Sequence, residues 1–145
     1  MAMKPSERAV SIEQVRALLR KSSRDLKDAA TDGLSAERCF TILYEAGFSC
    51  AQAFALANKV EAPREGGFGH HHETLEYMVE GLGLSEAVRE QNRIVRTTRN
   101  ANMYTGAEDV SEQDLKTVFF WAQRVQTETF AWFQKNMPAA LPKKR

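Results

Sequence analysis

The sequence is poor in the residues that build covalent or metal-bound scaffolds: among 145 residues it has two cysteines and three histidines. Cys39 and Cys50 form no CxxC pair, and within one expected helix they lie about three turns, or roughly 16 Å, apart. A disulfide requires Cα atoms within about 7 Å of each other. We therefore expect both thiols to be free and to pack as small apolar residues.

The chain also has no excess of charge of one sign, and no apolar run approaches the roughly 18 residues of a membrane span. Its 20 basic and 19 acidic residues give a formal charge of +1, so no global field draws it toward nucleic acid or an acidic membrane. Any such binding has to come from local clusters. The opening residues, MAMKPSERAV, lack the hydrophobic core of a signal peptide. We expect a cytoplasmic protein without a membrane partner.

Helical periodicity is what the chain does have, and no segment convincingly predicts a strand. Apolar residues recur at helical spacing in residues 11–30, 35–59, 70–83, 85–104 and 111–137. The second segment is apolar nearly all round, which is typical of a central helix. Short connections favour antiparallel neighbours, and the break at residues 60–69 is long enough for a crossover. We predict an all-α, up-and-down bundle of four or five helices, a single domain at residues 11–136 between flexible termini at residues 1–10 and 137–145.

The expected helix at residues 85–104 has two different faces. One face carries arginine, amide and phenol side chains within a quarter-turn of each other, namely Arg93, Arg96, Asn100 and Tyr104. The opposite, apolar face consists of Ile94, Val95, Thr98 and Ala101. Guanidinium forks and amide donors together suit phosphate or carboxylate oxygens. The polar face therefore predicts an anion-binding site.

A solvated surface with local ion pairs is the alternative for this helix. Glu90 is spaced to pair with Arg93, and such surface pairs are common and weak, about 0–1 kcal/mol. No acidic residue lies within a helical turn of Arg96 or Arg99. Local pairing therefore accounts for the first arginine of the face better than for the later ones.

The segment HHHETLE at residues 70–76 is similar to a zinc-binding HExxH motif, but its second histidine is missing. Adjacent histidines on a helix point about 100° apart and do not readily share one metal ion. We expect no metal site here. Instead, one of the three histidines is expected to be tucked against a neighbouring helix or site.

Three segments in order resemble the HEPN domain, the helical family of higher eukaryotes and prokaryotes nucleotide-binding proteins. The most specific is RTTRNANMY followed by VSEQDLKTVFFWAQRV, similar to the family signature of an arginine, a polar residue and a histidine leading into the last helix. The segments FGHHHETLEYMVEGLG and SAERCFTILYEAGFSCAQAFALANK also resemble parts of such domains. Together they cover roughly residues 34–133.

The resemblance implies a homodimer in which the motif helices of two protomers face each other, with the arginines lining the cleft between them. Arg99 corresponds to the motif arginine and Asn100 to the polar residue, while Tyr104 stands where the family has histidine. Catalytic members are metal-independent ribonucleases without a cofactor, so these three positions are the candidate catalytic residues. The substrate contacts we expect beside them are Arg93, Arg96, His71 and His72.

Tyr104 departs from the family pattern, because a phenol with a pKa of about 10 is a poor general base at neutral pH. It can still donate a hydrogen bond to phosphate or stack on a base. Three functions stay open. The first is a dimeric module that binds RNA or nucleotide phosphate, such as a component of a toxin–antitoxin system. The second is a ribonuclease toxin, with one of His70–His72 replacing the missing histidine. The third is an interaction subunit paired with a small nucleotidyltransferase.

Overall fold

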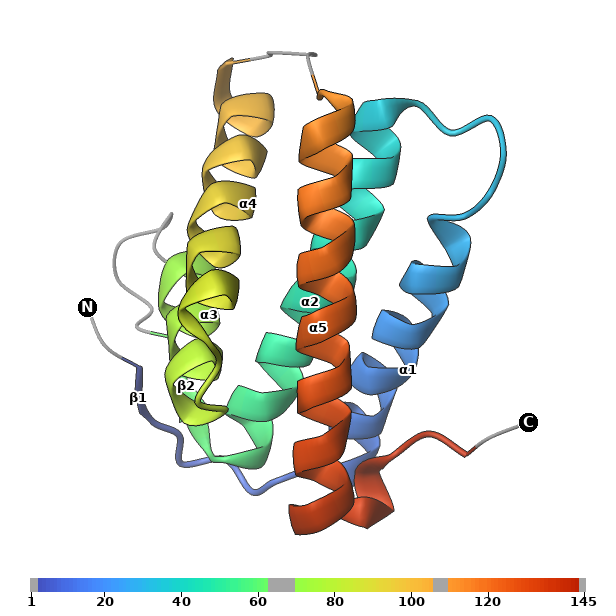
Figure 1. Cartoon of the computed structure of the whole chain (residues 1–145). Helices are drawn as coiled ribbons and strands as arrows, with labels where there is room; N and C mark the ends of the chain where they lie inside the picture. Colours follow the sequence, from blue (N-terminus) through green and yellow to red (C-terminus); the bar gives the residue numbers. More distant parts are fainter. Residues whose placement is uncertain (1–2, 63–69, 106–109, 144–145) are drawn as a thin grey trace.

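The computed structural model describes residues 3–62, 70–105 and 110–143, and for residues 70 and 102–105 it describes only the backbone. Most of this part of the chain is α-helical (Figure 1). The helices are α1 (Ile12–Asp28), α2 (Ala36–Ala57), α3 (His70–Gly81), α4 (Glu86–Thr105) and α5 (Glu112–Asn136). The predicted all-α helical bundle is confirmed.

The long helices alternate in direction: in Figure 1, α1 and α4 run upward and α2 and α5 run downward. α2 and α5 occupy the middle of the bundle, with α1 on one side and α3 and α4 on the other. Of these, α2 packs against all four other helices. It is therefore the element on which side chains from α3, α4 and α5 can meet.

Serine side chains cap four of the helices. The caps that accept a backbone N–H of the following turn are Ser11, Ser35, Ser85 and Ser111. At the start of α5 the bond is reciprocal, because the Asp114 carboxylate also accepts the backbone N–H of Ser111 at 3.0 Å. Each cap of this kind stabilises a helix by about 1 kcal/mol. These caps fix where the helices begin, and with them the register of the side chains in each helix.

The expectation that the chain has no strand is wrong for two short segments. β1 (Lys4–Pro5) pairs antiparallel with β2 (Val60–Glu61). The backbone N–H of Ser6 extends the pairing by donating to the carbonyl of Lys59 at 2.8 Å. Strands of two residues leave no alternating pattern in the sequence, since such a pattern needs about four residues to be recognised. The pairing holds the N-terminal segment beside the end of α2.

α2 is the core helix of the bundle. The expectation that no apolar run approaches the length of a membrane span is wrong for α2, which is long and apolar enough by composition alone. However, 61% of its most apolar stretch is buried inside the fold. Its inward side chains include Phe40, Leu43, Ala46 and Phe54, which pack with residues from α3, α4 and α5. The position of α2 between the other helices explains why it has almost no polar face.

A smaller apolar cluster closes the end of the bundle where α5 finishes. It joins Val15 and Leu19 of α1 to Phe133 of α5, and it includes Ala140, which follows in the short 3-10 helix η1 (Pro138–Ala140). The side chain of Arg16 donates to the carbonyl of Ala139. The segment after α5, expected to be a flexible tail, thus packs back on α1 over its first residues.

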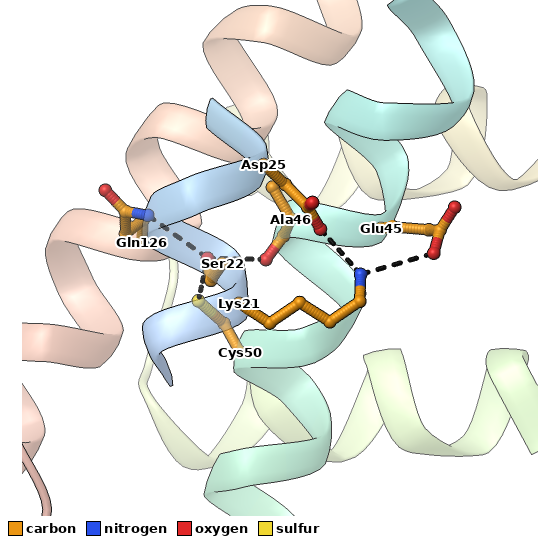
Figure 2. Close-up of polar contacts among 7 residues, drawn as sticks. All are labelled: Lys21, Ser22, Asp25, Glu45, Ala46, Cys50 and Gln126. Carbon is orange, nitrogen blue, oxygen red and sulfur yellow. Dashed lines mark hydrogen bonds and ion pairs between the residues drawn. The ribbon is translucent and has the colours of Figure 1, made fainter. Parts of the chain in front are cut away.

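Ser22 connects three helices on the opposite side of α2 from α3 and α4 (Figure 2). Its buried hydroxyl donates to the carbonyl of Ala46 at 2.7 Å and accepts from the amide of Gln126 at 3.1 Å. The thiol of Cys50 lies 3.2 Å from the same oxygen. Because this contact involves α1, α2 and α5, it fixes their mutual register.

Candidate functional site

Tyr44 lies at the centre of a group of rings and guanidinium groups formed by α2, α3, α4 and α5. Only 1% of the residue is exposed, and its ring stacks on Trp121 of α5 with centroids 5.7 Å apart. Gly47, one turn later on α2, makes room for the indole, because a Cβ at that position would lie 2.3 Å from Trp121 Cζ3. The core therefore holds the Tyr44 ring in place.

His71 approaches the same phenol from α3. The Tyr44 hydroxyl lies 3.0 Å from Nδ1 of His71, and the imidazole tautomer decides which of the two donates. The imidazole also stacks on Phe48, with centroids 4.0 Å apart and planes 4° from parallel. The prediction that one of the three histidines is tucked against a neighbouring helix is confirmed for His71.

Arg99 covers the Tyr44 ring from α4. Its guanidinium carbon lies 5.1 Å from the ring centroid, which is a cation–π contact. Such a contact stabilises a structure by about 0.5–2 kcal/mol, with the larger values at desolvated sites. Arg99 itself is half-buried, so part of the residue stays accessible to solvent.

Arg96 brings a second positive charge to the group. Its Nε atom is buried but has no hydrogen-bond partner among the described residues. Among the residues that the structure describes, no carboxylate forms an ion pair with Arg96 or Arg99. A buried donor without an acceptor costs about 1–3 kcal/mol. The pair of guanidinium groups therefore has unused capacity to bind an anionic acceptor.

Burial determines the protonation state of Tyr44. It raises the pKa of the phenol to about 12, although the positive charges of Arg99 and Arg96 act in the opposite direction by favouring the phenolate. The phenol therefore keeps its proton at neutral pH. Tyr44 is a hydrogen-bonding group here, not a base.

The predicted polar face of α4 divides into two parts. Arg93 is exposed and pairs with Glu90 one turn earlier, as the solvated alternative predicts. The positive charges of Arg96 and Arg99 instead favour the phenolate of Tyr44, and Arg99 also makes the cation–π contact with its ring. Asn100 is half-buried. The backbone of Tyr104 belongs to α4, but its side chain lies outside the described residues, as does that of His70.

The apolar face predicted for α4 is partly wrong. Val95 is buried, but Ala101 is exposed. The buried side of the helix runs instead through Val88, Asn92 and Val95, and Arg99 follows one turn later on the same side. The predicted apolar face did not include Asn92 or Arg99. In the structure each has a partner inside the bundle.

The two histidines expected to contact a substrate lie in different environments. His71 belongs to the Tyr44 group, whereas His72 is exposed. Sequence reasoning did not single out Tyr44 or Trp121. The available signal was a phenol at the centre of an otherwise apolar helix, since a buried tyrosine hydroxyl usually has a polar partner.

The chemistry that the group offers is donation to negatively charged oxygens. Guanidinium groups, a protonated phenol and an imidazole are all donors to phosphate or carboxylate. In the described residues, no three His, Cys, Asp or Glu side chains are placed to hold a metal ion. Comparisons with protein-family models, curated proteins and solved structures found no significant match to the chain. The group's own geometry therefore carries the functional interpretation.

Proposed function

We propose that the protein binds RNA or nucleotide phosphate through Arg96 and Arg99, with Tyr44 and His71 beside them. One observation carries the proposal: two half-buried arginines converge on a buried phenol, and no described carboxylate pairs with either. Two like charges that share a partly desolvated site repel each other, and a bound phosphate relieves that repulsion. Arginine forks also match the geometry of phosphate oxygens.

The test is binding of a fluorescently labelled, short single-stranded RNA, followed by anisotropy at several salt concentrations. Arg99→Ala is expected to weaken binding about tenfold or more, since a charge-assisted hydrogen bond contributes about 1.5–3 kcal/mol. It should also make the salt dependence shallower, because fewer counterions are released. Arg124→Ala removes an equal charge from an exposed position on α5 and serves as the matched control. Equal losses in both variants would reduce the site to a nonspecific basic surface.

A homodimer belongs to the same proposal through the resemblance to HEPN domains. In that arrangement α4 of each protomer faces its copy, and the two arginine pairs line one cleft. Sedimentation equilibrium tests this arrangement, with a dimer as the expected species. A monomer that still binds RNA would separate the anion site from the dimer. Pairing with a nucleotidyltransferase stays a prediction.

Ribonuclease activity is a second candidate, and the position of His71 favours it. The imidazole and Arg99 both contact Tyr44, so an imidazole and a guanidinium group lie at one place. In the expected reaction the 2′-oxygen forms a bond to the adjacent phosphorus and the bond from phosphorus to the 5′-oxygen breaks. His71 takes the proton of the 2′-hydroxyl and delivers it to the departing 5′-oxygen, while Arg99 stabilises the negative charge on the phosphate.

This candidate predicts RNA cleavage in the presence of EDTA that leaves 2′,3′-cyclic phosphate ends. His71→Ala should abolish the cleavage. His72→Ala removes the neighbouring, exposed imidazole and provides the comparison. Cleavage that survives His71→Ala would assign the activity to other residues or to a contaminant. Binding without cleavage would rule out the ribonuclease and leave RNA or nucleotide binding as the proposed function.

A further inference from the structure

Asn92 is a completely buried polar residue in the middle of α4. Its amide oxygen accepts from the indole Nε1 of Trp121 on α5 at 3.2 Å. Its amide nitrogen donates to a carboxylate oxygen of Glu76 on α3 at 3.4 Å. One side chain thus connects α4 to both α3 and α5.

The chemistry of this bridge requires an amide. Trp121 can only donate, and the ionised carboxylate of Glu76 can only accept. Position 92 therefore needs one acceptor and one donor on a short side chain. Aspartate would supply a second carboxylate facing Glu76, and leucine would leave the buried indole N–H without an acceptor.

The spacing along α4 relates this bridge to the arginines. Arg96 and Arg99 follow Asn92 by four and seven residues, so all three lie on one side of the helix. The indole that Asn92 holds is also the ring that stacks on Tyr44. Asn92 therefore fixes both the rotation of α4 and the support under the phenol that Arg99 covers.

We propose that Asn92 is a positioning residue of the anion site: through Trp121 and Glu76 it sets the rotation of α4 that brings Arg96 and Arg99 to Tyr44. This inference rests on the proposed function. It differs from a general role in stability, because it predicts that breaking the bridge displaces the two guanidinium groups in protein that is still folded.

The experiment exchanges the donor and the acceptor in the hydrogen bond between residues 92 and 76. In Asn92→Asp the carboxylate still accepts from Trp121 but faces Glu76. In the double variant Asn92→Asp with Glu76→Gln, the new glutamine donates to the new aspartate, and the bridge is restored with donor and acceptor exchanged. Glu76→Gln alone is the reference for the double variant. Gln123→Glu, at an exposed position on α5, matches the change of charge elsewhere.

Two readouts are measured in each variant: the affinity for the labelled single-stranded RNA, and the NMR signals of the Arg96 and Arg99 side-chain Nε–H groups. Asn92→Asp is expected to lower the affinity about fivefold or more and to shift both arginine signals. The double variant is expected to return both readouts to those of Glu76→Gln. Gln123→Glu should leave them unchanged.

Folded Asn92→Asp protein with unmoved arginine signals would overturn the proposal, and so would a double variant no better than the single one. If the wild-type protein does not bind the RNA, the proposed function fails. The positioning role is then decided by the arginine signals alone. If Asn92→Asp does not fold, Trp121→Phe replaces it, because phenylalanine keeps a ring over Tyr44 but removes the donor to Asn92. Unmoved arginine signals in that variant would overturn the proposal.

Discussion

Arg99 and Tyr44 form a cation–π pair, with the guanidinium carbon 5.1 Å from the centre of the phenol ring. The pair joins α4, which carries the two arginines that act on Tyr44, to α2, the core helix of the bundle. Because the core holds Tyr44 in place, the position of Arg99 depends on the packing beneath it.

The hydroxyl of Tyr44 is expected to contribute to stability through His71. Tyr44→Phe keeps the stacked ring but removes the 3.0 Å hydrogen bond, so it should lower the free energy of unfolding by about 1 kcal/mol. Urea denaturation measures the change. Tyr77→Phe removes the same atom from a half-buried tyrosine that packs on Phe54, and it should cost less. Equal costs would show that the bond to His71 adds nothing.

Alkaline conditions are expected to weaken the fold through the same phenol. Burial raises the pKa of Tyr44 from 10.0 in the unfolded chain to about 12, so below pH 10 both states keep the proton and the stability is fully present. As the pH rises from about 10 to 12, the unfolded chain loses its proton first and unfolding becomes more favourable. The loss approaches about 2–3 kcal/mol at the upper end of this range.

Denaturation of the wild-type protein and Tyr44→Phe at a series of pH values measures this loss. The stability of Tyr44→Phe should fall less steeply above pH 10, because the contribution of Tyr44 is absent. Parallel curves for the two proteins would mean that Tyr44 ionises in the folded protein as easily as in the unfolded chain.

Gly47 is expected to tolerate no side chain while Trp121 is present. Gly47→Ala gains about 1 kcal/mol of helix propensity, but its Cβ would lie 2.3 Å from a rigid ring. Overpacking of this kind typically costs about 1–3 kcal/mol, so the net change should be destabilising. Phenylalanine lacks the outer ring that the Cβ meets, so the double variant with Trp121→Phe should lose less than the sum of the two single changes.

Gly33→Ala, alone and combined with Trp121→Phe, is the control for the test at Gly47. Gly33 has open space around it and a positive φ of 88°, so its cost comes from backbone strain and should be independent of Trp121. Additive effects at both glycines would contradict the close approach between Gly47 and the indole.

The two cysteines are expected to differ in reactivity. Cys50 is completely buried, and burial raises the pKa of its thiol to about 11, whereas Cys39 is only half-buried. Since the thiolate is the reactive form, iodoacetamide should label Cys39 in the folded protein and Cys50 only after unfolding. Mass spectrometry of the digested protein measures both sites. Labelling of Cys50 at the rate of Cys39 under native conditions would contradict the packing around Ser22.

Much of the fold could be predicted from the sequence, because periodicity and capping are local signals. Helical spacing located the helices, and Ser11, Ser35 and Ser111, which cap three of them, are the type of residue expected at a helix start. The pairing of β1 with β2 could not be predicted. It involves two residues on each side and depends on how the chain returns after α2, which no local pattern records.

The candidate site was predictable only in part. Helical geometry identified a polar face on α4, and the resemblance to HEPN domains singled out Arg99. Which polar residues turn inward depends on partners in other helices, and the rotation of α4 follows from Trp121 and Glu76, both distant in the sequence. Tyr44 was missed for the same reason: its role arises from contacts that the fold brings together.

The most direct test of the anion site is a titration of the ¹⁵N-labelled protein with inorganic phosphate, followed through the side-chain Nε–H signals of the arginines. The site predicts saturable shifts of Arg96 and Arg99, while the exposed Arg93 and Arg124 move little. Shifts of equal size at all four arginines, or movement of the exposed pair alone, would contradict a phosphate site at Tyr44.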